Sequence, residues 1–190
     1  FTGRPLVLDW ESDNVPAILN VWYAGSEAGH AISDAVFGRT NPCGKLTTTF
    51  PRAVGQEPLY YNYLQCSRPP WTNEHFVAYN SNSIVVANTP LYPFGYGLSY
   101  TDFEISSNMS EETDRGFRFA VSVKNTGHSV GKETVQLYLR KPCGRLGNPE
   151  RILVAFKKTV ELAPNEETRL DLFVEKSQLS SYDEDISAYV

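Results

Sequence analysis

The sequence has no cluster of basic residues and no long apolar run. Its 190 residues include 17 Lys and Arg against 22 Asp and Glu, which gives a formal net charge of −5. A surface that binds nucleic acid needs grouped Lys and Arg to contact phosphates, so this composition argues against nucleic-acid binding. Every apolar run is shorter than a membrane-crossing helix requires. No membrane span is therefore expected.

Cysteine and the short motifs of common enzymes are also scarce. The three cysteines, Cys43, Cys66 and Cys143, are widely spaced and form no CxxC pair. This spacing indicates neither a zinc site nor a disulfide framework, and small buried thiols are the expected role. The sequence holds no GxSxG, phosphate-loop or HExxH motif. We therefore expect no cofactor and no metal.

The N-terminal third predicts part of an α/β domain. Two apolar runs, 4–8 (RPLVL) and 15–23 (VPAILNVWY), are typical of buried strands. Apolar residues recur at helical spacing over 27–38, with Ser26 as a candidate N-cap and Gly38 as a candidate left-handed cap. Strand, turn and helix in this order indicate an α/β unit that is too small to be a complete domain.

The C-terminal half predicts a β-sandwich. Apolar and polar residues alternate in several short segments that turn residues separate, which is typical of such folds. In the first segment Phe117, Phe119, Val121 and Val123 share one face. The predicted strands lie at about 116–125, 133–141, 151–162 and 168–175. The chain is thus expected to be α+β overall, and 177–185 is expected to be a turn of helix or a corner.

Five motifs follow one another along the chain. They are VPAILNVWYAGSEAGHAISDAVFGRTNPCGKLTTTFP (15–51), GQEPLYYN (55–62), NTPLYPFGYGLSYTDFE (88–104), VKNTGHSVGKETVQLYL (123–139) and SYDED (181–185). In this order they resemble the C-terminal half of glycoside hydrolase family 3, of the β-glucosidase and β-xylosidase type. Cys43 and Thr47 depart slightly from the family pattern, which more often has serine and proline there.

The resemblance implies an arrangement of domains. Such enzymes have a (β/α)8 barrel, then an α/β sandwich domain, then a fibronectin type III-like β-sandwich of immunoglobulin-like form. Residues 1–60 would be the end of the α/β sandwich domain, 61–97 an aromatic-rich linker, and 98–190 the fibronectin-like sandwich without its last strand. We expect both ends of the chain to continue in a longer protein. The first residues form a turn that would normally follow another strand, and DEDISAYV (183–190) stops where the family usually has one more strand.

The resemblance also implies an activity that this chain does not perform by itself. A retaining glycosidase needs two carboxyl groups about 5–5.5 Å apart. In the family the nucleophilic Asp belongs to the barrel and the acid/base Glu precedes the matching segment, so no catalytic residue is assigned here. The implied partners are the N-terminal domains of a parent enzyme and its β-linked oligosaccharide substrate. A secreted or periplasmic location is expected from the family.

Two aromatic groups are candidate functional residues. Tyr92, Phe94, Tyr96 and Tyr100 would pack the two domains together, because large rings bury much area without regular backbone pairing. Trp71, Tyr61 and Asn62, in the aromatic loop over 60–75, are candidates for contact with sugar. Packing against a neighbouring domain is the alternative for that loop. Two other roles stay open for the whole chain, namely a separate carbohydrate-binding module and a purely structural module.

Three acidic groupings permit a chemical role, although a surface role is the expected alternative for each. They are Asp9 with Glu11 and Asp13, Glu27 with His30, and the run at 183–185. Acids at helix starts and solvated turns account for such groupings more often than metal sites do.

Overall fold

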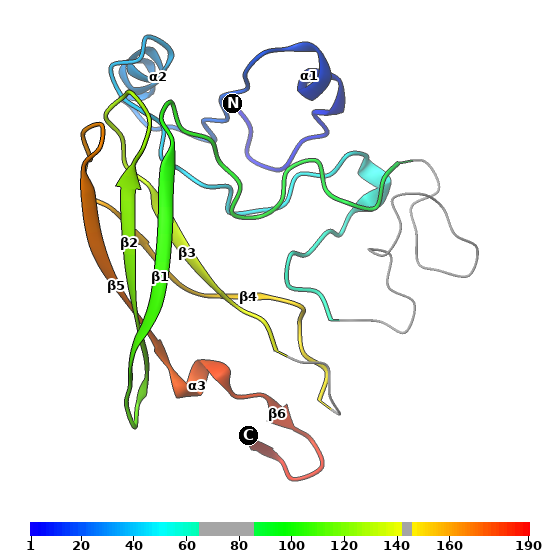
Figure 1. Cartoon of the computed structure of the whole chain (residues 1–190). Helices are drawn as coiled ribbons and strands as arrows, with labels where there is room; N and C mark the ends of the chain where they lie inside the picture. Colours follow the sequence, from blue (N-terminus) through cyan, green and yellow to red (C-terminus); the bar gives the residue numbers. More distant parts are fainter. Residues whose placement is uncertain (65–85, 142–145) are drawn as a thin grey trace.

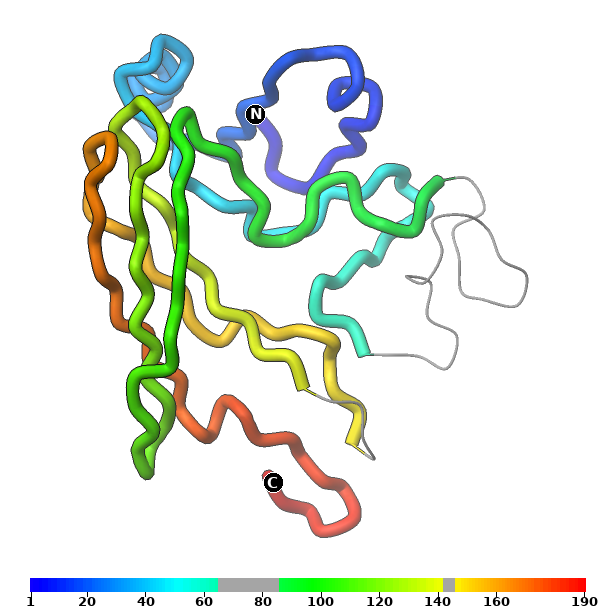
Figure 2. Tube along the Cα trace, viewed as in Figure 1, coloured from blue at the N-terminus to red at the C-terminus, as the bar shows by residue number. Residues whose placement is uncertain are grey.

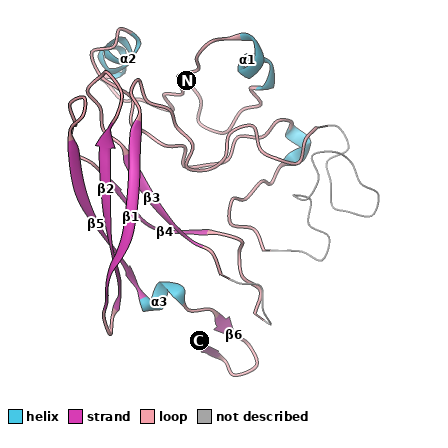
Figure 3. Ribbon diagram, viewed as in Figure 1, coloured by secondary structure: helices cyan, strands magenta, loops and turns pink. Residues whose placement is uncertain are grey.

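A computed structural model describes residues 1–64, 86–141 and 146–190. It consists of an irregular N-terminal part with short helices and a β-sandwich, with a C-terminal hairpin at the far end (Figures 1 and 3). The predicted class, α+β with a β-sandwich, is confirmed.

The N-terminal part contains α1 (Asp9–Asn14), α2 (Ala28–Val36) and the 3-10 turn η1 (Val54–Gln56). The expected strands over 4–8 and 15–23 are wrong, because both runs are irregular backbone. A strand requires a hydrogen-bonded neighbour, and none of the described residues pairs with either run. Their apolar side chains remain 37–41% exposed at Leu6, Val7, Ile18 and Leu19.

Helix α2 lies where the sequence predicts a helix, but its N-cap residue differs from the predicted one. The N-cap residue is Glu27, which makes no side-chain capping bond, so Ser26 does not cap the helix. Gly38 has a φ of +72°, the left-handed conformation expected just after the helix. Much of the apolar face of α2 lies open, since Val36 is 62% exposed.

Two antiparallel sheets form the sandwich (Figure 1). One has the order β1 (Phe103–Glu112), β2 (Gly116–Asn125) and β5 (Glu167–Glu175), and the other pairs β3 (Thr134–Leu139) with β4 (Ile152–Lys158). β2 lies in the middle of the first sheet, with Val121 opposite Leu170. The strands predicted from alternation are present, and 103–112 adds a strand that the pattern did not single out.

The core lies between the two sheets. Val123 and Leu162 are completely buried, and the inward positions of β2 and β5 alternate as predicted. Buried apolar area of this kind is the main favourable term in folding. The buried core residues are Val121, Val123, Val135, Leu162, Leu170 and Leu172.

The expected corner at 177–185 is a helical turn followed by a hairpin. It comprises α3 (Lys176–Leu179), β6 (Tyr182–Asp183) and β7 (Ala188–Tyr189). Asp183 is 3% exposed and its carboxylate accepts the N–H of Asp185, so a fully solvated acidic run is wrong at this position.

Long apolar helices and clusters of metal-binding side chains are both missing from the described residues. No helix there is long and apolar enough to cross a membrane. In the same parts of the chain no group of three His, Cys, Asp or Glu residues is placed to hold a metal ion.

Candidate functional site

The aromatic segment, residues 88–101, runs beside residues 46–50 at the junction between the N-terminal part and the sandwich (Figure 2). The two stretches exchange backbone hydrogen bonds. Leu46 donates to the carbonyl of Tyr96 at 2.7 Å and Phe50 donates to that of Tyr92 at 2.8 Å. The segment therefore pairs its backbone at isolated points and forms no regular strand there.

A row of rings lies on the N-terminal side of this junction. Phe50, 1% exposed, contacts Trp22 and Tyr92 edge-on, with ring centroids 5.9 and 6.5 Å apart. Tyr92 also stacks on Tyr96 at 5.1 Å. The Tyr92 hydroxyl donates to Oγ of Ser12, 3.0 Å away, which joins the row to α1. Trp22 has a φ of +49°, a strained conformation for a bulky residue.

A second group of rings contacts the sandwich. Phe94 stacks on Tyr61 with centroids 4.0 Å apart and ring planes within 10°. Tyr61 in turn meets Tyr138 of β3 edge-on at 6.4 Å, and its hydroxyl accepts the N–H of Leu153 in β4 at 3.4 Å. One face of the Tyr61 ring is thus occupied by Phe94, which favours packing over sugar stacking at that residue.

A hydrogen-bonded chain links this second group to the aromatic segment. The Tyr138 hydroxyl donates to Oε1 of Gln136 at 2.7 Å, and the Gln136 amide donates to the carbonyl of Gly95 at 2.9 Å. Burial raises the pKa of Tyr138, although the charge of Arg151 acts in the opposite direction, so the phenol keeps its proton as a donor. Gly95 has a φ of +81° and a Cβ there would collide with both side chains, so only glycine fits.

The remaining predicted residues lie apart. The Tyr100 hydroxyl donates to the carbonyl of Ala35 in α2 at 2.9 Å, while its ring is half exposed. Asn62 is exposed. Trp71 lies outside the described residues, as do Cys66 and Cys143. Sugar contact by Asn62 and Trp71 stays a prediction.

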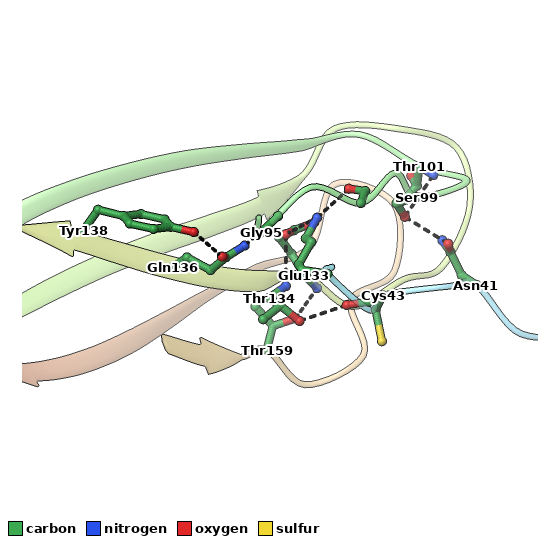
Figure 4. A network of polar contacts seen from close by, with 12 residues as sticks. Asn41, Cys43, Gly95, Ser99, Thr101, Glu133, Thr134, Gln136, Tyr138 and Thr159 are labelled. Carbon is green, nitrogen blue, oxygen red and sulfur yellow. Dashed lines mark hydrogen bonds and ion pairs between the residues drawn. The ribbon is translucent and has the colours of Figure 1, made fainter. Parts of the chain in front are cut away.

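A polar network, which the sequence analysis did not predict, lies at the same junction (Figure 4). The ammonium group of Lys45 lies 2.8 Å from Oε1 of Glu133, and these side chains are only 16% and 11% exposed. Asn41 and Cys43 also bond to the sandwich side. These residues are far apart in sequence and follow no period. Their only signal was that Asn41 to Lys45 and Glu133 lie inside two of the family-like motifs, 15–51 and 123–139.

The two acidic groupings of the N-terminal part adopt surface roles. Glu27 and His30 form a pair at 3.2 Å with both side chains more than 80% exposed. Oδ1 of Asp9 lies 3.4 Å from a guanidinium nitrogen of Arg52. Two hollows of about 530 and 350 Å³ occur on the sandwich, and each has one carboxyl group in its lining, Glu167 and Asp171 respectively. Neither hollow supplies the two carboxyl groups that retaining glycoside hydrolysis requires.

Comparisons with known proteins agree with this picture. Residues 1–100 match the glycosyl hydrolase family 3 C-terminal domain, and residues 133–190 match the fibronectin type III-like domain. A periplasmic β-glucosidase of Salmonella typhimurium is 44% identical over 168 residues, and a β-xylosidase of Formosa agariphila is 35% identical over 192. The structure of a Listeria innocua β-glucosidase in complex with isofagomine has a TM-score of 0.89 at 34% identity.

Each alignment covers most of this chain but only a small part of the relative. The alignments include 86% and 99% of this chain but 22% and 25% of the two sequence relatives. The Listeria innocua structure matches 100% of this chain and 27% of its own. The chain therefore spans about a quarter of the length of these relatives, and it belongs to glycoside hydrolase family 3 as a C-terminal segment.

Proposed function

We propose that the chain is the C-terminal structural segment of a retaining β-glycosidase whose catalytic carboxyl groups lie on other domains. The observation that carries this proposal is the similarity over 100% of the chain to about a quarter of a β-glucosidase. The hollows on the sandwich support it, because each offers a single carboxyl group. The role of this segment is then to support the catalytic domains.

Exposed apolar residues support a docking face for those domains. Trp10, Tyr23 and Phe37 are 67–86% exposed, and the open runs at 4–8 and 15–23 add to the same N-terminal part. Large uncovered apolar surface is typical of regions that meet a partner. We assign residues 1–60 to the end of an α/β sandwich domain, 61–97 to the linker and 98–190 to the fibronectin-like domain.

The names of the relatives support a proposal for the substrate class and the location of the parent enzyme. Their names indicate β-glucosidases and a β-xylosidase, one of them periplasmic. We assign to the parent enzyme the release of terminal β-D-glucosyl or related residues from oligosaccharides, in a secreted or periplasmic location.

The proposal is tested by assaying the purified 190-residue chain and a parent protein that includes it. We expect no hydrolysis of aryl β-glucosides by the chain and clear turnover by the parent. Co-expressing the chain with the remaining domains should restore activity if docking occurs without a covalent link. Turnover by the purified chain itself would refute the division of roles.

Replacing both Phe94 and Tyr96 with alanine should loosen the junction. Phe94 is partly buried and Tyr96 is 37% exposed, so the two rings together bury only part of the area of two fully buried rings. Losing about 1.4 kcal/mol of docking energy opens the junction roughly tenfold more often. We expect limited proteolysis of the junction to accelerate by at least that factor. A double variant at exposed positions, Tyr60→Ala with Leu98→Ala, is the matched control. Equal cleavage of both double variants would contradict the packing role.

A further inference from the structure

We infer that the Lys45–Glu133 ion pair and the Asn41 side chain fix the angle between the N-terminal part and the sandwich. The aromatic rings hold the two parts together, whereas these polar groups determine the orientation of one part relative to the other. The inference concerns the geometry of this chain and does not depend on the proposed glycosidase activity, so the two can fail separately.

The Lys45 ammonium group joins three parts of the chain at one point. It comes from the stretch beside α2, lies 2.8 Å from Oε1 of Glu133 in the sandwich, and donates to the carbonyl of Gly97 at 2.8 Å. Oε1 of Glu133 also accepts the N–H of Thr134 at 3.0 Å. The Glu133 N–H donates to Oγ1 of Thr159, 3.0 Å away. Both charges are therefore paired and further hydrogen-bonded, as buried charges require.

Asn41 makes a second contact of the same kind. Its amide nitrogen donates to the carbonyl of Val130 at 3.0 Å, and its Oδ1 accepts from the Ser99 hydroxyl and the Tyr100 N–H, both at 2.9 Å. One planar amide thus connects the N-terminal part, the aromatic segment and the loop before β3. Figure 4 shows Asn41 pointing toward Ser99, with Thr134 bonded to the carbonyl of Cys43.

Polar and aromatic contacts constrain a junction differently. Ring packing depends on buried area and tolerates some sliding, whereas a hydrogen bond weakens steeply when its angle falls below about 120°. For a buried ion pair, the cost of removing both charges from water offsets much of their attraction. Replacing such a pair with apolar residues of similar volume is often neutral for stability. The pair is then expected to contribute orientation more than net stability.

This separation of orientation from stability provides the test. In the full 190-residue chain, Lys45→Met or Glu133→Leu should each raise the unfolding equilibrium constant roughly a hundredfold or more, because one buried charge is left unpaired. The combined K45M/E133L variant should lie within about tenfold of the original chain. Urea titration followed by circular dichroism measures all three constants.

Orientation is read from residual dipolar couplings of backbone amides in α2 and residues 46–50 compared with those in β2 and β5. The original chain should fit one alignment tensor for both sets, and K45M/E133L should need two different tensors. The control is R118M/E111L, which replaces an exposed pair at 3.3 Å within the sandwich and should keep one tensor. Asn41→Ala, which leaves no buried charge, should also separate the tensors.

Three results would overturn the inference. The first is a single common tensor in both K45M/E133L and Asn41→Ala. The second is failure of K45M/E133L to fold, since the pair would then be needed for stability. The third is separation of the tensors in the R118M/E111L control, which would show that any loss of charge has the same effect.

Discussion

Replacing Phe50 with alanine is expected to lower the free energy of unfolding by about 3–5 kcal/mol, the range for a buried ring removed from a core. Phe50 is 1% exposed and sits between the rings of Trp22 and Tyr92. Its removal leaves a cavity between these two rings, and the bond from Tyr92 to Ser12 opposes movement of the Tyr92 ring into it. The aromatic junction should therefore lose its central contact.

Chemical unfolding in urea measures this change, and Phe156→Ala is the matched control. Phe156 is 67% exposed on β4, so its loss should change the unfolding free energy by less than about 0.5 kcal/mol. The m-value should stay the same if both variants unfold in one transition. Similar small effects for both phenylalanines would show that the row of rings does not stabilise the chain.

Replacing Asn125 with leucine is expected to cost at least about 3 kcal/mol, although the two side chains are close in size. Asn125 is fully buried at the end of β2. Its amide nitrogen donates to the carbonyls of Ser129 and Leu162 at 2.8 and 2.9 Å, and its Oδ1 accepts from Thr101 and Gly127. Each buried group left without its partner costs about 1–3 kcal/mol.

The same substitution at an exposed asparagine provides the control for Asn125. Asn62→Leu should change the unfolding free energy by less than about 0.5 kcal/mol. Thermal and urea unfolding of both variants give the comparison. If Asn125→Leu stays within about 1 kcal/mol of the original chain, the buried amide is not the link between these loops that its four bonds indicate.

The sequence predicted those elements whose signal is local. In β2 the alternation of Phe117 to Val123 matches a strand with one buried face, and the strand has neighbours on both sides. The run at 15–23 has equally suitable apolar residues but no pairing partner among the described residues. Periodicity indicates which side chains are suited to burial, but it does not indicate whether a neighbouring strand is present to pair with.

The sequence directed attention to the aromatic residues of the junction and not to its polar network, and the interdomain role of the rings stays a prediction. Tyr92, Phe94 and Tyr96 stood out because rings, prolines and glycines are dense around them. Lys45 and Glu133 are single charges 88 positions apart in sequence (133 minus 45), and nothing local distinguishes them from solvated residues. A contact between distant segments depends on how the parts pack, which one sequence does not display.

Strand β1 has a consequence for the behaviour of the molecule at high concentration. It pairs with β2, and between Met109 and Glu111 the register shifts. Among the described strands no other lies on its far side. Glutamates at 104, 111 and 112 place negative charge on this edge strand. Charged side chains and an irregular register both hinder backbone pairing of an edge strand with a strand of another molecule. The unpaired edge of β1 is thus expected to resist aggregation through strand pairing.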